Sequence, residues 1–275
     1  MKLVDVGSGT PVVLVPGIQG RWEWMKPAVD TLARHCRVIT FSLADEPTYG
    51  GPFDESSGFS SYVQQVADVL DAAGLRQAAI CGVSYGGLVA ATFAARHRDR
   101  VLSLVLVSAM PPSWQPDARA RFFLRWPRLL SPLFCLGSLR MYPEIAAAVP
   151  GLASSIAAAI RHGFRALTHM FSPGRMARRV RMLESAGGVK ASGYVAELER
   201  VNVPTLVVTG EPPLERVVPV ALTREYLRIW PHAQAATIAR TGHLGLITRP
   251  DEFARILLSF LAASSDTDAQ RRRVV

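Results

Sequence analysis

The chain has 275 residues, 49% of them hydrophobic, and a formal net charge of +9. The hydrophobic share is ample for a core, and we expect one large domain that carries an insertion. The first ten residues lack the apolar core of a signal peptide. The longest apolar stretch, Ile145–Ile160, is interrupted by Pro150-Gly151 and is too short and too rich in Ala to span a membrane. These features predict a soluble, cytoplasmic protein without a transmembrane segment.

Strand and helix patterns alternate through residues 1–110. Strands are predicted at Lys2–Val6, Pro11–Val15, Val38–Leu43, Ala78–Cys81 and Val101–Met110. Helices are predicted at Met25–Cys36, Phe59–Ala73 and Leu88–His97. Gly7-Ser8-Gly9-Thr10 joins the first two strands, and its composition predicts a hairpin link.

The alternation resumes after residue 200. Strands are predicted at Thr205–Thr209 and Ala233–Ala239, and helices at Val220–Trp230 and Pro250–Leu261. Such an order predicts an α/β fold with a mostly parallel sheet covered on both faces, formed by residues 1–110 and 201–263. Residues 264–275 are expected to form a flexible tail. Its run of three arginines is too short to indicate a nucleic-acid partner.

Residues 111–200 break the alternation. They contain 13 Lys and Arg against 5 Asp and Glu, and so hold +8 of the net charge. Helices are predicted at Ala118–Trp126, Leu129–Leu139, Ile145–Val149, Leu152–Leu167, Arg175–Ser185 and Tyr194–Arg200. We expect a helical cap, or lid, whose apolar faces build a substrate pocket. Its arginines are expected to face solvent; contact with an anionic substrate group or membrane surface is the alternative.

The cysteines Cys36, Cys81 and Cys135 lie in apolar contexts without C-x-x-C spacing. This pattern predicts a reducing compartment and no metal site. Cys81 lies near a candidate nucleophile but inside an apolar strand, which indicates a buried structural thiol.

A candidate nucleophile follows the strand at Ala78–Cys81. Gly82-Val83-Ser84-Tyr85-Gly86 matches G-x-S-x-G, the signature of a nucleophile elbow at a strand-to-helix turn. Such a turn forces the serine into a strained conformation, and side chains at 82 or 86 would collide with neighbouring backbone. The alternative is a Gly/Ser turn without chemistry.

A neutral serine needs a base within hydrogen-bond reach, oriented by a third group. Of six histidines, His243 alone lies in a loop just after a strand, in Thr241-Gly242-His243-Leu244-Gly245, and is the predicted base. In the order Ser, acid, His, the acid should follow the strand ending at Thr209. Glu211 and Glu215 are the only carboxylates there.

Together, PGIQG, GVSYGG, GEPPLERVVP and TGHLGLITRPDEF resemble the α/β-hydrolase superfamily, in the serine branch with a helical cap. The resemblance covers most of residues 1–110 and 201–262. The family's acid loop usually runs G-x-x-D-x-x-x-P. Here ERVVP matches its end, with Glu for Asp and two additional residues before it, which favours Glu215 over Glu211.

The resemblance also implies an oxyanion hole built from the backbone N–H groups of Ile18 and Tyr85. Pro16-Gly17 stands where the family usually has His-Gly. A serine nucleophile argues against the dehalogenase and epoxide hydrolase branches, which use aspartate. No metal or organic cofactor is implied.

We therefore expect a hydrolase that cleaves a carboxylic ester or thioester of a small hydrophobic substrate through an acyl-enzyme. Trp22 and Trp24 are candidate substrate-binding residues beneath the cap. A C–C bond hydrolase and a cofactor-free perhydrolase are alternatives with the same triad. A non-catalytic small-molecule receptor is an alternative of another class. The oligomeric state, a homodimer included, stays open.

Overall fold

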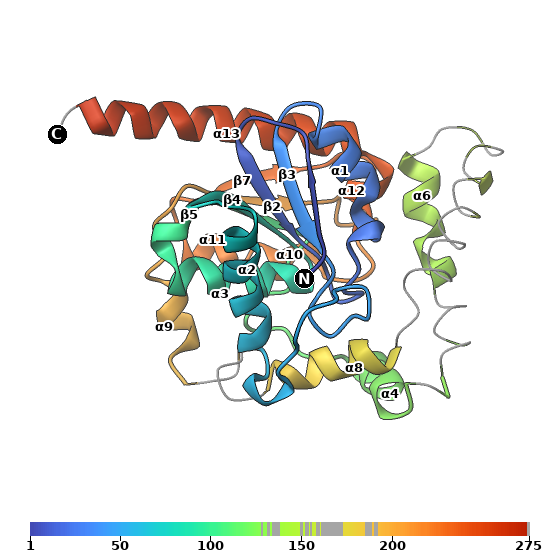
Figure 1. Ribbon diagram of the computed structural model, residues 1–275. Helices are drawn as coiled ribbons and strands as arrows, with labels where there is room; N and C mark the ends of the chain where they lie inside the picture. The colour runs from blue at the N-terminus through green and yellow to red at the C-terminus, as the bar shows by residue number, and fades with distance from the viewer. Residues whose placement is uncertain are drawn as a thin grey trace.

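A computed structural model describes the chain over most of its length (Figure 1). The described residues are 1–127, 129–130, 133, 138–148, 151, 154, 156–157, 160, 173–184, 189 and 192–273. Seven strands form one sheet in the order β1-β3-β2-β4-β5-β6-β7. They are β1 (Leu3–Val6), β2 (Pro11–Val15), β3 (Arg37–Phe41), β4 (Ala78–Val83), β5 (Val101–Val107), β6 (Thr205–Thr209) and β7 (Gln234–Thr237). All neighbouring pairs are parallel except β1 with β3, so the predicted α/β class is confirmed.

The predicted hairpin between the first two strands is wrong. Strand β3 lies between β1 and β2, with Leu3 opposite Phe41 and Val12 opposite Val38. Gly7 in the link has φ +79°, and a Cβ there would lie 2.3 Å from the carbonyl oxygen of Cys36. The link therefore packs against the end of the first helix instead of closing a two-strand turn.

Helices cover both faces of the sheet. They include α1 (Lys26–Leu32), α2 (Ser60–Ala72), α3 (Tyr85–Arg96), α10 (Val220–Thr223), α11 (Tyr226–Ile229), α12 (Gly245–Thr248) and α13 (Pro250–Arg273). The sequence predicted the last helix to end at Leu261, but it continues to Arg273 through most of the expected tail. Ala and Arg are good helix formers, and no Gly or Pro interrupts residues 262–273. The single helix expected at Val220–Trp230 is divided into α10 and α11.

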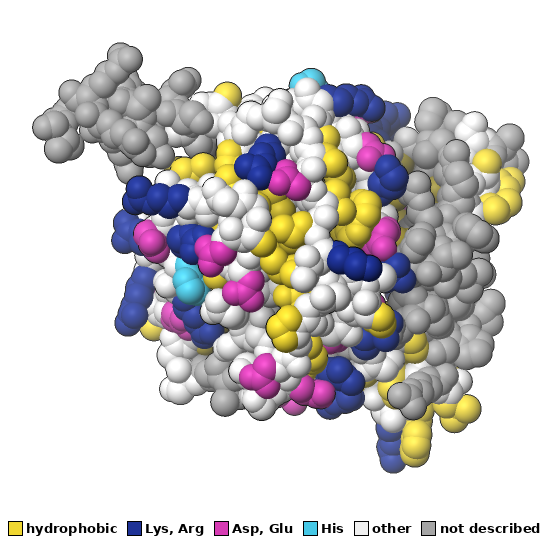
Figure 2. All heavy atoms as spheres, in the orientation of Figure 1, with side chains coloured by type: hydrophobic (Ala, Val, Ile, Leu, Met, Phe, Trp, Pro, Cys, Tyr) yellow, Lys and Arg dark blue, Asp and Glu magenta, His cyan; other side chains and the backbone are white. Residues whose placement is uncertain are grey.

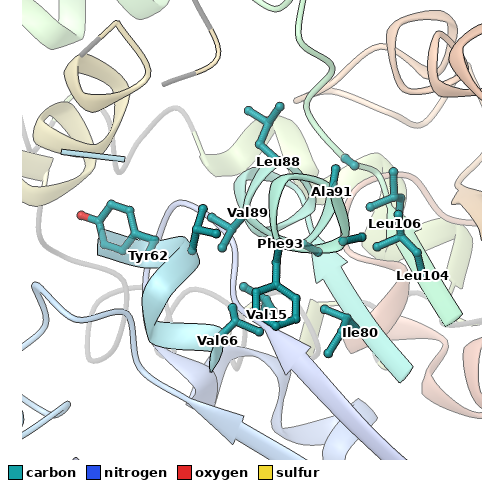
Figure 3. Close-up of a cluster of buried hydrophobic side chains, with 14 of the residues drawn as sticks. Val15, Tyr62, Val66, Ile80, Leu88, Val89, Ala91, Phe93, Leu104 and Leu106 are labelled. Atoms are coloured by element: carbon teal, nitrogen blue, oxygen red, sulfur yellow. The ribbon is translucent and has the colours of Figure 1, made fainter. Parts of the chain in front are cut away.

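Alternate residues of the central strands point to two separate cores. In β2, Val13 and Val15 pack with α2 and α3, whereas Val12 and Leu14 pack with α1 and α13. Figure 3 shows α3 over the sheet in the first of these cores, with Val15, Ile80 and Leu104 beneath it. Burial on both faces explains the continuous apolar runs in the parallel strands. This packing on both faces also fixes the positions of the strand ends that carry the candidate site.

The described helices of the insertion are α4 (Ala118–Arg125), α6 (Tyr142–Ala148), α8 (Pro173–Met182) and α9 (Tyr194–Leu198). Each overlaps a predicted helix. The helices predicted at Leu129–Leu139 and Leu152–Leu167, and Cys135, fall largely or wholly outside the described residues. Within the described part of the chain, no helix is long and apolar enough to cross a membrane.

Candidate active site

Ser84 lies at the turn between β4 and α3, as the sequence predicts. Its backbone has φ 54° and ψ −116°, a conformation that costs a non-glycine residue free energy. A Cβ at Gly82 would lie 2.2 Å from the carbonyl oxygen of Gly86, and one at Gly86 would lie 2.4 Å from that of Val15. The two glycines therefore let the strand, the turn and the helix approach closely enough to hold Ser84 in this conformation.

The loop after β2 lies directly beside Ser84. A Cβ added at Gly17 would lie 3.4 Å from the Ser84 Cβ and 3.3 Å from the carbonyl oxygen of Val83. Ile18 is the next residue of this loop, and Tyr85 is the first residue of α3. Both candidate oxyanion donors are thus adjacent in sequence to residues in close contact at the turn.

His243 and Glu215 are in direct contact. The imidazole Nδ1 lies 3.2 and 3.3 Å from the two carboxylate oxygens of Glu215, and both side chains are almost fully buried. Glu215 Oε1 also accepts hydrogen bonds from the N–H groups of Val217 and Val218. The carboxylate is therefore held in place on one side while it contacts the imidazole on the other.

The electrostatics of this pair favour charge separation. Burial alone would lower the pKa of His243, but the Glu215 carboxylate and, less strongly, Glu144 leave it raised. Burial alone would raise the pKa of Glu215, but His243 and the two backbone N–H donors leave it lowered. Glu215 is thus stabilised as an anion, and a proton on the imidazole is stabilised with it.

Glu211, the other carboxylate of the loop, has a different partner. Its Oε1 accepts a hydrogen bond from the backbone N–H of Arg240, and its own N–H donates to the carbonyl of Thr241. A Cβ at Gly242 would lie 2.4 Å from the carbonyl oxygen of Leu214. Backbone packing therefore joins the loops that carry Glu215 and His243, and Glu211 bonds to the backbone just before His243.

The expected triad also requires a hydrogen bond between the Ser84 hydroxyl and His243. No such bond is present among the described residues. Ser84 is buried, with 4% of its surface exposed. Catalytic hydrogen bonds are often long without substrate, so the assignment of Ser84 and His243 as partners stays a prediction.

Cys81 is buried in the strand, and burial raises the pKa of its thiol well above the usual range, as expected of a structural cysteine.

The two candidate substrate-binding tryptophans have different surroundings. Trp24 is buried among Met141 and Ile145 of the insertion and Leu244 beside His243. Trp22 is partly buried against the core that lies beneath α1 and α13. Trp24 therefore lies at the junction of the insertion and the His243 loop, whereas Trp22 packs on the core. A role for either in substrate binding stays a prediction.

A buried ionic network that was not predicted from the sequence joins α8 to the core. Arg179, fully buried, donates to Asp45 and Glu46 and to the carbonyl oxygen of Ile18, at 2.6 Å in its shortest bonds. Arg175 lies 3.0 Å from Glu46. Both arginines thus pair with core carboxylates; Arg179 is fully buried, and Arg175 is partly exposed. The adjacent carboxylates Asp45 and Glu46, just after β3, were the feature of the sequence that could have indicated this network.

On the face shown in Figure 2, Lys and Arg side chains are interspersed with Asp and Glu. The α8 residue Arg178 follows the same pattern, with its guanidinium 3.5 Å from Glu55. The excess positive charge of the insertion is therefore partly neutralised by the core. Among the described residues, no cluster of three or more His, Cys, Asp and Glu could hold a metal ion.

Glu144 of α6 is a further residue that was not predicted from the sequence, and it lies near His243. Its side chain is fully buried and accepts hydrogen bonds from Thr241 and Gly242. Burial raises the pKa of Glu144, while these donors and His243 act in the opposite direction. A lone acidic residue in the apolar stretch MYPEIAAAV was the available signal.

A model of the alpha/beta hydrolase family matches residues 12–256. The chain is 27% identical to a 2-hydroxy-6-oxo-2,4-heptadienoate hydrolase of Pseudomonas putida over 95% of this chain and 92% of that protein. It is 26% identical to a putative carbamate hydrolase, RutD, of Azorhizobium caulinodans, over 92% of each chain. The solved structure of an esterase from Exiguobacterium antarcticum has the same fold, with a TM-score of 0.75 and 17% identity over 94% of each chain.

Proposed function

Because the chain belongs to the α/β-hydrolase family, we propose that it is a serine hydrolase that cleaves a carboxylic ester or thioester of a hydrophobic substrate. Ser84 is the nucleophile, His243 the base and Glu215 the acid. The observation that carries the proposal is the buried contact between His243 and Glu215, in a chain that also holds Ser84 at a strained elbow.

In the first half of the reaction, the Ser84 hydroxyl attacks the substrate carbonyl while His243 Nε2 takes its proton. Glu215, which contacts Nδ1, keeps the imidazole in one tautomer and stabilises the imidazolium that forms. The protonated imidazole then delivers its proton to the leaving alcohol or thiol, which departs and leaves an acyl-enzyme on Ser84. In the second half, His243 activates water, which attacks the acyl carbonyl and releases the acid.

The oxyanion of each tetrahedral intermediate would accept hydrogen bonds from the N–H groups of Ile18 and Tyr85. One such donor is worth about 3–4 kcal/mol of transition-state stabilisation in a serine protease. Three features support this role: the close approach of the backbone at Gly17 to Ser84, the position of Tyr85 at the start of α3, and the bond from Arg179 that holds the Ile18 carbonyl. The Ile18 side chain itself is not required.

The test is hydrolysis of p-nitrophenyl esters of increasing acyl length by the wild type and by Ser84→Ala. We expect turnover that depends on chain length, covalent labelling by a serine-directed fluorophosphonate, and loss of both in the variant. A flat chain-length profile would count against a deep apolar pocket beneath the insertion. An absence of turnover and of labelling in the folded wild type would favour the receptor alternative.

Hydrolysis of a C–C bond is the second candidate, because a relative that aligns over nearly the whole chain is named a 2-hydroxy-6-oxo-2,4-heptadienoate hydrolase. The same attack on a carbonyl would apply, with a carbon leaving group that must be protonated. Comparing kcat/KM for that dienoate with kcat/KM for the best p-nitrophenyl ester decides between them. A dienoate value higher by about 100-fold or more would make C–C hydrolysis the principal activity.

A further inference from the structure

Glu144 is a buried carboxylate to which the proposed mechanism assigns no step. Its Oε1 accepts hydrogen bonds from the Thr241 hydroxyl and the Gly242 N–H, both at 2.7 Å, and from the Leu244 N–H. Two of these donors are the backbone N–H groups of the residues immediately before and after His243. The carboxylate therefore holds the loop on both sides of the candidate base.

The helix that carries Glu144 is docked on the same loop through apolar contacts. Ile145 of α6 and Met141, the residue just before the helix, pack in one buried cluster with Leu244 and Trp24. The charged and apolar contacts of α6 thus converge on a segment about a hundred residues away in sequence. Because α6 belongs to the insertion, these contacts connect the insertion to the base of the proposed triad.

Burying a carboxylate is unfavourable unless hydrogen bonds compensate for the lost hydration. At Glu144 the compensation comes from one loop, and it falls on one oxygen. Glu144 Oε2 is buried with no hydrogen-bond partner in the described part of the chain. Because the N–H groups of Gly242 and Leu244 can converge on one oxygen only if the loop is curved around it, the interaction selects that loop conformation.

We propose that Glu144 is a positioning residue for His243: it holds residues 241–244 in the conformation that presents the imidazole to Ser84. Catalysis then depends on the docked position of α6. This inference rests on the proposed function, since it assumes that His243 is the base. The role requires an acceptor oxygen at position 144 and does not require a negative charge.

Two substitutions separate the acceptor from the packing. Glu144→Gln keeps an oxygen that can accept from the two backbone N–H groups, whereas Glu144→Leu fills similar space without an acceptor. We expect kcat for p-nitrophenyl butyrate to fall by about 10- to 100-fold in Glu144→Leu, as for a displaced catalytic group. KM should change far less, because the loss is in the chemical step. Glu144→Gln should restore most of kcat.

Ala146→Gly is the matched control, because it weakens the same helix through its lower helix propensity and leaves the three hydrogen bonds and the docking cluster in place. Rates are expressed per folded molecule, with the folded fraction taken from thermal unfolding. We expect Ala146→Gly to retain kcat within about threefold of the wild type, since an alanine-to-glycine change in a helix costs only about 1 kcal/mol. Wild-type kcat in Glu144→Leu, or equal losses in Glu144→Leu and Glu144→Gln, would overturn the proposal.

A readout that is independent of turnover separates this inference from the proposed function. Amide hydrogen exchange of Gly242 and Leu244, followed by NMR, should be slow in the wild type and in Glu144→Gln, and much faster in Glu144→Leu. If the wild type neither hydrolyses esters nor reacts with fluorophosphonate, the proposed function fails whatever the exchange rates are. If it does both and these amides exchange equally fast in all variants, the positioning role fails alone.

Discussion

The elbow and the acid–base pair are built in opposite ways. Residues 82–87 are contiguous, and the glycines at 82 and 86 remove the side chains that would prevent the turn. Glu215 and His243 lie 28 residues apart and meet because two loops pack backbone against backbone. The first part of the site is specified locally, and the second exists only when strands β6 and β7 lie side by side.

This difference explains which substitutions each part should tolerate. At the elbow, the five neighbours of Ser84 within residues 82–87 hold the candidate nucleophile, so a single added methyl group acts on Ser84 directly. At the acid–base pair, the carboxylate is held by Val217 and Val218 and the loop by Glu144, so the geometry depends on several separate contacts. Substitutions at the two regions should therefore differ in effect.

Removal of the nucleophile should have the largest effect. We expect Ser84→Ala to lower kcat for a p-nitrophenyl ester by about 10⁴-fold or more, since only the oxyanion hole and binding would remain. Steady-state kinetics, with fluorophosphonate labelling as a check, measure the loss. A variant that retained a tenth of the wild-type rate would exclude Ser84 as the nucleophile.

Glu215→Gln should lower kcat by about 10⁴-fold at most, by analogy with the aspartate-to-asparagine change in a serine protease triad. An amide can neither stabilise the imidazolium nor enforce the required tautomer. Glu211→Gln is the matched control, because Glu211 bonds to the N–H of Arg240 and not to the imidazole. A larger loss in Glu211→Gln than in Glu215→Gln would reverse the assignment of the acid.

The glycines of the two regions provide a direct comparison. Gly242→Ala would bring a Cβ within 2.4 Å of the Leu214 carbonyl, and Gly86→Ala within 2.4 Å of the Val15 carbonyl. Each change should destabilise the fold by about 1–3 kcal/mol, the usual cost of overpacking. Gly242→Ala should also lower kcat by about 100-fold, since separating the loops displaces His243. Urea denaturation and kinetics on the folded fraction measure the two effects.

The pH dependence should report the raised pKa of His243. The base must be neutral, so kcat/KM should fall about tenfold per pH unit below that pKa, and the fall should begin at a higher pH than an ordinary histidine would give. Removing the carboxylate in Glu215→Gln should move the limb to lower pH, because an adjacent negative charge is what raises the pKa. An unchanged limb in Glu215→Gln would mean that another group controls it.

The smallest effect is expected far from both regions. Arg96 of α3 and Glu197 of α9 form an ion pair at 2.6 Å whose side chains are each 28% exposed. Glu197→Ala should lower the free energy of unfolding by about 0.2–1 kcal/mol, as for other exposed pairs, and leave kcat unchanged. A large loss of activity would show that α9 affects the site, which the contrast above does not predict.

The alternation of strands and helices, the elbow, and the loops that contain the candidate acid and base could all be predicted from the sequence. These features follow from local causes: two-sided burial makes parallel strands continuously apolar, and a strained turn requires glycine. Strand order was not determined, because residues 7–10 suit a hairpin as well as a link around β3. The sequence restricted the acid to Glu211 or Glu215.

The identity of the carboxylate that contacts His243, and the partners of Arg179 and Glu144, became visible only in the folded chain. Both residues come from the insertion, and their partners lie roughly a hundred residues or more away in sequence. The physical reason is that a hydrogen bond depends on the distance between two atoms, and no local pattern records which distant loop a buried charge will meet. Periodicity can predict that a helix forms, but only packing determines what its side chains contact.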